Sequence, residues 1–190
     1  MKTINYKITM LSDWHIGSGL DAGAYADAIV LKDEDGLPYI PGKTIKGLLK
    51  DAANEMLSVN KADKQIIDTL FGGVNPDKST FPGIAFFKNA VLTEIEKKEI
   101  VKNGLQEYLY KNVASTRIEK KTGVAKKNSL RTVEVTIPVE LIGEIVLVEV
   151  KDNEVEVMDL LEKSFKWVRH LGVNRNRGLG RCKFEIIENN

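Results

Sequence analysis

The chain has 190 residues, of which 43% are hydrophobic and 29% are charged, and its formal net charge is +1. This length predicts one domain with a core of its own, and the small net charge excludes a global field that would attract the protein to nucleic acid. The single cysteine, Cys182, excludes an internal disulfide and a cysteine-rich zinc site. No apolar run is long enough to span a membrane, and the N-terminus has the pattern of a strand and not of a signal peptide, so we expect a cytoplasmic protein.

The first half of the chain alternates strand-like and helix-like patterns. Apolar and polar residues alternate from Ile4 to Met10, which predicts a strand. The turn Asp33–Gly36 separates two short apolar segments and indicates a hairpin. In chain order we expect a strand at 4–10, a loop rich in glycine and alanine at 15–26, hairpin strands at 28–32 and 37–40, and helices at 43–57 and 60–70.

The second half predicts the remaining elements of a mixed fold. We expect a strand at 84–92, a short charged helix at 94–102, one or two central strands within 133–150, a final helix at 158–171 and a closing strand at 182–187. The segment 115–135 contains too few apolar residues to bury a face, so we expect a long projecting β-hairpin or a partly ordered loop there. Antiparallel hairpins and a helix before the last strand favour an α+β fold with an RRM-like, ferredoxin-type sheet.

Charge is segregated along the chain although the net charge is small. Residues 115–131 hold six cations against the single acid Glu119, and residues 140–162 hold eight acids against the single cation Lys151. The six cations are Arg117, Lys120, Lys121, Lys126, Lys127 and Arg131. One cationic and one acidic surface suit a protein that contacts RNA on one side and other proteins on the other.

The loop at residues 174–183 combines arginines with glycines just before the closing strand. Gly178 and Gly180 allow positive φ angles and a close approach of the backbone to a ligand. Backbone amides directed at an anion, with guanidinium groups beside them, predict binding of a phosphate-rich polyanion. The arginines are Arg175, Arg177 and Arg181. The loop is neither a dinucleotide fingerprint nor a P-loop, because it has only Gly-x-Gly and leads into a strand; the alternative is a solvated basic turn.

The segment at residues 37–47 gives a second candidate phosphate site. Pro41 and Gly42 place the following residues at a helix N-terminus, where free amides and the helix dipole favour an anion. The side chains that project from these first turns are Lys43, Thr44, Lys46 and Lys50. The alternative is a corner between hairpin and helix with solvated lysines.

Four segments in this order resemble the RAMP superfamily, the repeat-associated proteins of CRISPR systems. They are residues 13–19, 37–47, 112–138 and 174–184, and together they span nearly the whole chain. Residues 38–47 are similar to the family's Pro-Tyr-Ile-Pro-Gly-Ser-Ser-x-Lys-Gly, with Lys43 and Thr44 in place of the two small hydroxyl residues. In this family that segment holds guide-RNA phosphates. Residues 112–138 resemble the family's thumb, a β-hairpin that inserts between nucleotides of the duplex of guide and target.

The likeness is closest to the repeated backbone subunits of type III CRISPR effector complexes. It implies a single ferredoxin-like domain over residues 1–190, with a thumb insertion around 113–136. The implied partners are guide RNA, target RNA, other effector subunits and further copies of the chain along the guide, with no membrane. The residues that we expect to bind RNA are Lys43, Thr44, Lys46, Lys50, Arg117, Lys120, Lys121, Lys126, Lys127, Arg131, Arg175, Arg177, Gly178, Gly180 and Arg181.

Asp27 decides, under this resemblance, whether the protein also cuts RNA. It aligns with an aspartate of the family's target-cutting backbone subunits, and a carboxylate at this place can position a divalent ion such as Mg²⁺ or Mn²⁺. Asp21, Asp33 and Asp35 lie nearby in the sequence, and a lone aspartate is usually a turn or cap residue. A non-catalytic, structural RNA-binding subunit is therefore an alternative.

His15 indicates a third function, that of a metal-independent endoribonuclease which processes guide RNA with a histidine as general base. We expect His170 to lie inside the final helix, so that no second catalytic partner is evident. We expect Trp14 and Trp167 to lie in the core or to line a groove.

Overall fold

The computed structural model describes residues 1–19, 26–148 and 153–187, and its largest sheet has four antiparallel strands. These strands are β1 (Lys2–Met10), β4 (Ala85–Phe87), β7 (Glu140–Leu147) and β8 (Cys182–Ile187). They lie in the order β4-β7-β1-β8, so the first and last strands of the chain are neighbours. Helices lie between β1 and β4 and between β7 and β8 in the sequence, which completes the ferredoxin-like fold that the sequence predicts.

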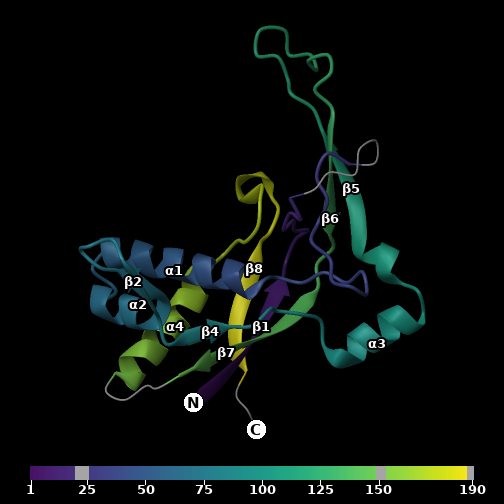
Figure 1. Cartoon of the computed structure of the whole chain (residues 1–190). Coiled ribbons are helices and arrows are strands. Elements are labelled where there is room, and N and C mark those ends of the chain that lie inside the picture. Colours follow the sequence, from purple (N-terminus) through teal and green to yellow (C-terminus); the bar gives the residue numbers. More distant parts are fainter. Residues whose placement is uncertain (20–25, 149–152, 188–190) are drawn as a thin grey trace.

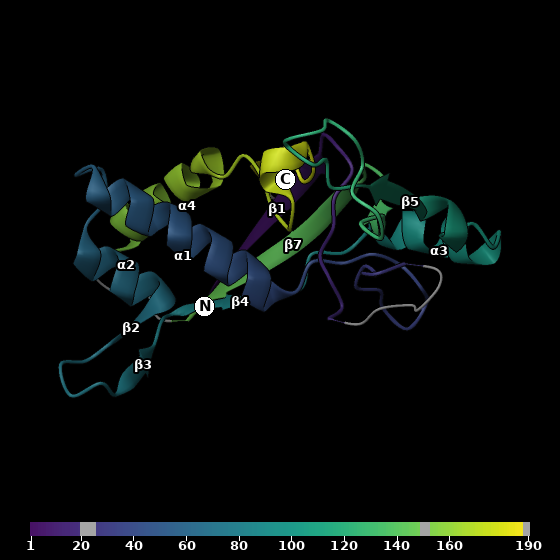
Figure 2. The ribbon, with the colours of Figure 1, turned by 90° about the horizontal axis from the view of Figure 1, so that it is seen from above.

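Helices gather on one face of this sheet and form with it the palm of the molecule (Figures 1 and 2). They are α1 (Gly42–Ser58), α2 (Lys64–Phe71) and α4 (Glu154–Trp167). Every second side chain of β1 is buried beneath them: Ile4, Tyr6, Ile8 and Met10. The ring centroid of Tyr6 lies 5.2 Å from that of Phe165 on α4, which joins helix and sheet in one core. Among the described residues no helix is long and apolar enough to cross a membrane.

Short elements complete the chain around the palm. They are β2 (Gly72–Val74), β3 (Thr80–Pro82), α3 (Glu94–Lys102) and two 3-10 helices, η1 (Gln106–Leu109) and η2 (Arg175–Arg177). Helix α3 covers the predicted residues because its start is encoded locally: the Thr93 hydroxyl accepts a hydrogen bond from the backbone N–H of Glu96, and the Glu96 carboxylate accepts one from that of Thr93.

A β-hairpin projects from the palm and forms the thumb, residues 110–136 (Figure 1). Its base consists of β5 (Tyr110–Ser115) and β6 (Arg131–Thr136), paired antiparallel. Residues 116–130 extend beyond these strands, with a single bridge between Ile118 and Ala125, and nearly all of their side chains are exposed. The predicted projecting hairpin is confirmed.

Shortening the tip of the thumb should leave the stability of the protein almost unchanged. Residues 119–124 can be replaced by Asn-Gly, which closes a two-residue hairpin between the bridged Ile118 and Ala125. Because the removed side chains are exposed, we expect the melting temperature to change by no more than about 2 °C, while engagement of a guide–target duplex weakens. Thermal unfolding followed by circular dichroism checks this, and a large drop would show that the tip packs on the palm.

The final helix was placed wrongly by the sequence pattern: it covers residues 154–167 and not 158–171. Val168 has an extended backbone (φ −69°, ψ 121°). Beyond it, the N–H of Leu171 donates to the carbonyl of Gly180, and the N–H of Cys182 donates to that of Arg169. Pairing with the chain before β8 therefore replaces the last helical turn, and His170 is exposed outside the helix.

Three other boundaries differ from the prediction. The strand at 84–92 is regular only over 85–87, and single bridges at Ala90 and Val91 continue it. The helix predicted at 60–70 begins at Lys64, because the Asp63 side chain caps its N-terminus. The hairpin at 28–40 is a tight turn closed by one bridge between Lys32 and Pro38. Residues 20–25 of the predicted loop at 15–26 lie outside the described residues.

Candidate nucleic-acid interface

A cationic groove lies where the thumb rises from the palm. We call it the thumb groove; it is lined by Ser115, Thr116, Arg117, Lys126, Lys127, Asn128, Ser129, Arg131 and Arg177. These side chains come from two stretches of the chain, the thumb and the glycine loop at 172–181, and 45 residues lie between Arg131 and Arg177 in the sequence. None of the five cations forms an ion pair within the described part of the chain. Their charge is therefore available to an anion.

The glycine loop positions Arg177 through two left-handed residues. Asn174 (φ 57°) and Gly178 (φ 87°) flank the single turn η2, and the N–H of Arg177 donates to the carbonyl of Asn174. A Cβ atom on Gly178 would meet nothing within 4 Å, so this glycine is needed for its backbone angle and leaves open space above it. The turn thus presents the Arg177 side chain to the thumb groove.

Gly180 has a packing role that the sequence analysis did not anticipate. It is buried, and a Cβ atom there would collide with the carbonyl oxygen of Leu171. Its N–H donates to the carbonyl of Asp13 at 2.7 Å, and the N–H of Arg181 donates to the Ser12 hydroxyl at 3.0 Å. These two amides are consequently not free for an anion, and the cationic side chains remain as the phosphate-binding groups.

The glycine loop packs on the residues that follow β1. The N–H of Val173 donates to the carbonyl of His15 at 3.0 Å, and Gly172 allows the same carbonyl to approach so closely that a Cβ atom would collide with it. Trp14 is buried at 1% exposure, with its indole N–H donating to the carbonyl of Ile137. Together with the hydrogen bond from Gly180 to Asp13, these contacts bring together two of the four segments that carried the family resemblance, 13–19 and 174–184.

Asp27 lies at the base of the thumb, where it pairs with Thr132 of β6. Its N–H donates to the carbonyl of Thr132 at 2.8 Å, and its Oδ2 accepts the N–H of Thr132 at 2.7 Å. The side chain is exposed, and Oδ1 has no hydrogen bond to any described residue. One carboxylate oxygen is thus fixed by β6, at the residue that follows Arg131 of the thumb groove, while the other has no hydrogen-bond partner among the described residues.

A buried ion pair, which the sequence analysis missed, holds the segment after Asp27 against β6. The Glu134 side chain is 3% exposed; its Oε1 accepts from Lys32 Nζ at 2.9 Å and its Oε2 accepts from the N–H of Val30 at 3.0 Å. The Lys32 ammonium also lies 3.9 Å from the ring centroid of Tyr110. Burial raises the pKa of the Tyr110 phenol above its usual range, and the negative charges of Glu134 and Asp33 raise it further.

The rival catalytic residue His15 is enclosed by the fold. It is 3% exposed, and its Nδ1 lies 2.6 Å from the carbonyl oxygen of Glu134, so that nitrogen carries the proton and donates. His170 is exposed on a different segment, opposite Arg181. Neither histidine lines the thumb groove, so the structure does not bring a histidine base to the candidate interface.

The other predicted RNA contacts are spread around this interface. Lys43 is exposed and Thr44 and Lys46 are half-buried at the start of α1, whereas Lys50 donates through Nζ to the carbonyl of Gly72 at 2.6 Å and is thereby engaged within the palm. Lys120 and Lys121 are exposed at the thumb tip. Arg175 and Arg181 are exposed but line other cavities than Arg177 does.

A divalent ion fits this site only if bound RNA supplies some of its ligands. Within residues 1–19, 26–148 and 153–187, no three histidine, cysteine or acidic side chains are grouped closely enough to hold a metal ion. Asp27 supplies one carboxylate with a free oxygen. Mg²⁺ commonly binds through one carboxylate together with substrate phosphates and waters, so the residues present are compatible with an ion that RNA helps to hold.

Comparisons with known proteins agree with this architecture. The family model described as the RAMP superfamily matches residues 7–183. Among solved structures, a type III-B Cmr-beta chain in the apo state superposes with a TM-score of 0.75 at 14% identity, covering 98% of each chain. A chain of the type III-B Cmr-beta assembly bound to cognate target RNA superposes with a TM-score of 0.73 at 12% identity, and the match covers 98% of this chain and 97% of that one. The search of curated proteins returned no match.

Proposed function

The chain belongs to the RAMP superfamily, and from this membership we propose that it is an RNA-binding backbone subunit of a type III CRISPR effector complex. Both similar structures come from a type III-B assembly, one of them bound to cognate target RNA. In such an assembly several copies line up along a guide RNA, each covering one short segment and contacting further effector subunits.

The thumb groove is the observation that best supports this proposal. It combines five unpaired cations from two distant parts of the chain, Arg117, Lys126, Lys127, Arg131 and Arg177. Lysine and arginine contacts to phosphates are independent of sequence, so they hold a guide RNA of any sequence and leave its bases free to pair with a target. The thumb projects beyond this groove, where it can separate neighbouring nucleotides of the duplex.

We further propose that Asp27 makes each copy a metal-dependent endoribonuclease for target RNA. Its side chain is anchored to Thr132, which follows Arg131 of the thumb groove in the chain, and this supports a position within reach of a phosphate bound by Arg131. A bound Mg²⁺ or Mn²⁺ would supply charge stabilisation at the phosphate and activation of the attacking hydroxyl. The carboxylate would hold and orient that ion, and its bond to Thr132 fixes its direction.

Two alternatives remain as outcomes of experiment. A non-catalytic subunit is favoured by the isolation of Asp27 from other metal-binding side chains of the described residues. A metal-independent guide-processing enzyme that uses His15 would require the ring to become accessible, since it is enclosed between the glycine loop and β6.

Replacing Arg117, Arg131 and Arg177 together by alanine should weaken RNA binding for every sequence. Each lost phosphate contact to single-stranded RNA lowers the slope of log K against log salt by about 0.7, so we expect a decrease of about 2 units if all three contribute. Filter binding of several unrelated RNA sequences between low and high salt measures both effects.

A matched control replaces three cations that are ion-paired on the palm. Lys64, Lys88 and Lys163 pair with Asp68, Glu144 and Asp159, and their replacement by alanine changes the net charge by the same amount. This control should keep most of its affinity and its salt slope. Equal losses of RNA affinity and salt slope in both variants would show that net charge alone determines binding, and would contradict the proposed interface.

A further inference from the structure

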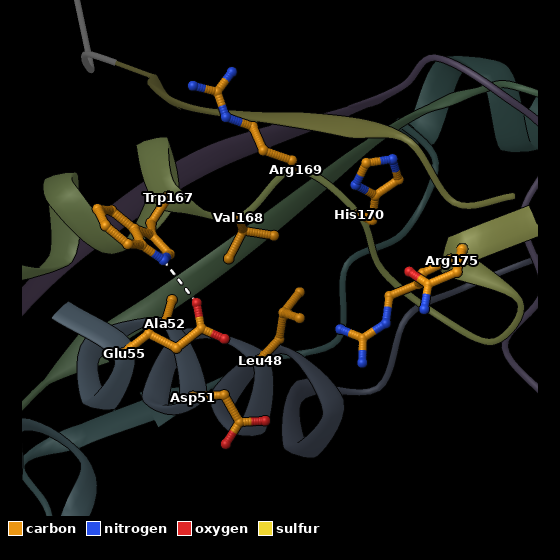
Figure 3. A pocket seen from close by; sticks show the side chains of 10 residues that line it. Leu48, Asp51, Ala52, Glu55, Trp167, Val168, Arg169, His170 and Arg175 are labelled. Carbon is orange, nitrogen blue, oxygen red and sulfur yellow. Dashed lines mark hydrogen bonds between the residues drawn. The ribbon is translucent and has the colours of Figure 1, made fainter. Parts of the chain in front are cut away.

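A second cavity lies between α1 and the segment that joins α4 to the glycine loop (Figure 3). Its volume is 230 Å³, below the ~300–1,000 Å³ of pockets for whole drug-sized ligands, so it suits one planar ring with a small polar extension. None of its lining residues also lines the thumb groove. The proposed grip on phosphates along the thumb therefore leaves this cavity without a role.

The inner surface of the cavity is apolar and ends at a fixed aromatic ring. Leu48, Ala52 and Val168 contribute the apolar wall. Trp167 is 37% exposed, and its Nε1 donates to Glu55 Oε2 at 2.8 Å, which holds both side chains in place. An apolar wall beside an indole is a surface on which a nucleobase is stabilised.

Opposite charges face each other across this wall. Glu55 and Asp51 project from α1, and Arg175 and His170 come from the other side. Figure 3 shows the Arg175 guanidinium pointing across Leu48 towards α1, whereas Arg169 points away from the cavity. In the described part of the chain no ion pair joins the two walls, so both signs of charge remain available to a ligand.

We propose that this cavity binds one unpaired guanosine nucleotide of RNA. Guanine alone among the four bases offers two adjacent N–H donors, N1 and N2, on its pairing edge, and these match one carboxylate. The Glu55 carboxylate accepts them, Asp51 adds a second acceptor at the mouth, and Arg175 with His170 holds the phosphate. The inference rests on the proposed RNA-binding function and adds to its sequence-independent contacts one that a copy makes only where its RNA segment presents an unpaired guanosine.

Titration of the full chain with guanosine monophosphate and inosine monophosphate tests this assignment. Inosine lacks only the N2 amino group, so we expect it to bind at least tenfold more weakly, because one charge-assisted hydrogen bond is lost. Tryptophan fluorescence reports binding at Trp167, since Trp14 is buried at 1% exposure. Trp167→Phe should remove the signal, and calorimetry on that variant should still detect guanosine monophosphate.

The Glu55→Gln variant tests whether the Glu55 carboxylate recognises the guanine base. Glutamine still accepts the indole N–H of Trp167 but cannot pair as an anion with two donors, so the preference for guanosine over inosine should disappear. Equal binding of both nucleotides to the wild type, or an unchanged preference in Glu55→Gln, overturns the proposal.

Single-stranded RNAs that carry one guanosine or one inosine distinguish a free nucleotide from a residue of RNA as the ligand. A tenfold preference for guanosine in RNA, even if the monophosphate binds too weakly to detect, supports the cavity as a site for RNA. No preference in either form overturns it. In that case RNA binding that still depends on Arg117, Arg131 and Arg177 leaves the proposed function standing, and loss of that dependence refutes the function separately.

Discussion

Asp27→Asn should abolish metal-dependent cleavage of target RNA and leave RNA binding intact. Asparagine keeps an oxygen that accepts the N–H of Thr132, so the base of the thumb retains its geometry. The substitution removes the negative charge that a divalent ion requires, and a loss of several kcal/mol in the transition state corresponds to a rate decrease of at least about 10²- to 10³-fold. The measurement is guide-directed cleavage in a reconstituted assembly with Mg²⁺, together with the RNA affinity of each variant.

Two controls separate this effect from a general loss of acidic charge. Asp35→Asn removes a carboxylate from the neighbouring turn, where it pairs with Lys97 at 2.7 Å, and should cut as the wild type does. A chelator should stop cleavage by the wild type. Cleavage that survives Asp27→Asn contradicts the catalytic assignment. No cleavage by the wild type, in an assembly with verified guide and target, identifies a structural subunit.

His15 has its own test in the same assay. His15→Asn keeps a side-chain N–H that can donate to the carbonyl of Glu134, and it removes the imidazole that would act as the general base. We expect target cleavage to persist in this variant. Loss of cleavage only in His15→Asn, combined with indifference to a chelator, would instead support guide processing.

Glu134→Ala should cost the protein a large part of its free energy of unfolding. The substitution leaves the N–H of Val30 and the ammonium of Lys32 without their buried partner. Removing one member of a buried ion pair typically destabilises by about 3–5 kcal/mol, and solvent reaches Lys32 (35% exposed), which favours the lower end of this range. Urea unfolding measures the loss as a lower midpoint at an unchanged slope.

Glu140→Ala is the matched control for this substitution. Glu140 pairs with Lys7 at 3.1 Å, but the Glu140 side chain is 49% exposed, whereas that of Glu134 is 3% exposed. The hydrogen bonds from Lys7 and Thr9 lower the pKa of Glu140, but an ion pair this open to solvent contributes little to the stability of the fold. If the urea midpoint of Glu134→Ala is as high as that of Glu140→Ala, the prediction is contradicted, because Lys32 and Val30 must then have found other partners.

The elements that the sequence predicted well are those whose signals are local. Helix α3 begins with a capping box, and β1 alternates apolar and polar residues, so neighbouring residues encode both. The end of α4 was misplaced because the apolar period continues through Val168 and Leu171, while Leu171 pairs with Gly180 and Arg169 pairs with Cys182. Such pairing leaves no trace in local periodicity.

The candidate site was predictable in its parts and not in its assembly. The cations of the thumb and of the glycine loop stand out by composition, and the structure brings five of them together. The partnership of Lys32 with Glu134 spans 102 residues, and the need for a glycine at position 180 comes from the carbonyl of Leu171 and not from a ligand. Contacts between distant segments decide these roles, and one sequence does not display them.

The hydrogen bonds between Asp27 and Thr132 have a mechanical consequence. Strand β6 carries the thumb on one side and, through Thr132 and Glu134, holds the segment of Asp27 and Val30 on the other. The projecting hairpin (Figure 1) and the segment of Asp27 are therefore attached to the same strand. Because the hydrogen bonds from Thr132 and Glu134 join that segment to β6, we expect a tilt of the hairpin to move Asp27 with it.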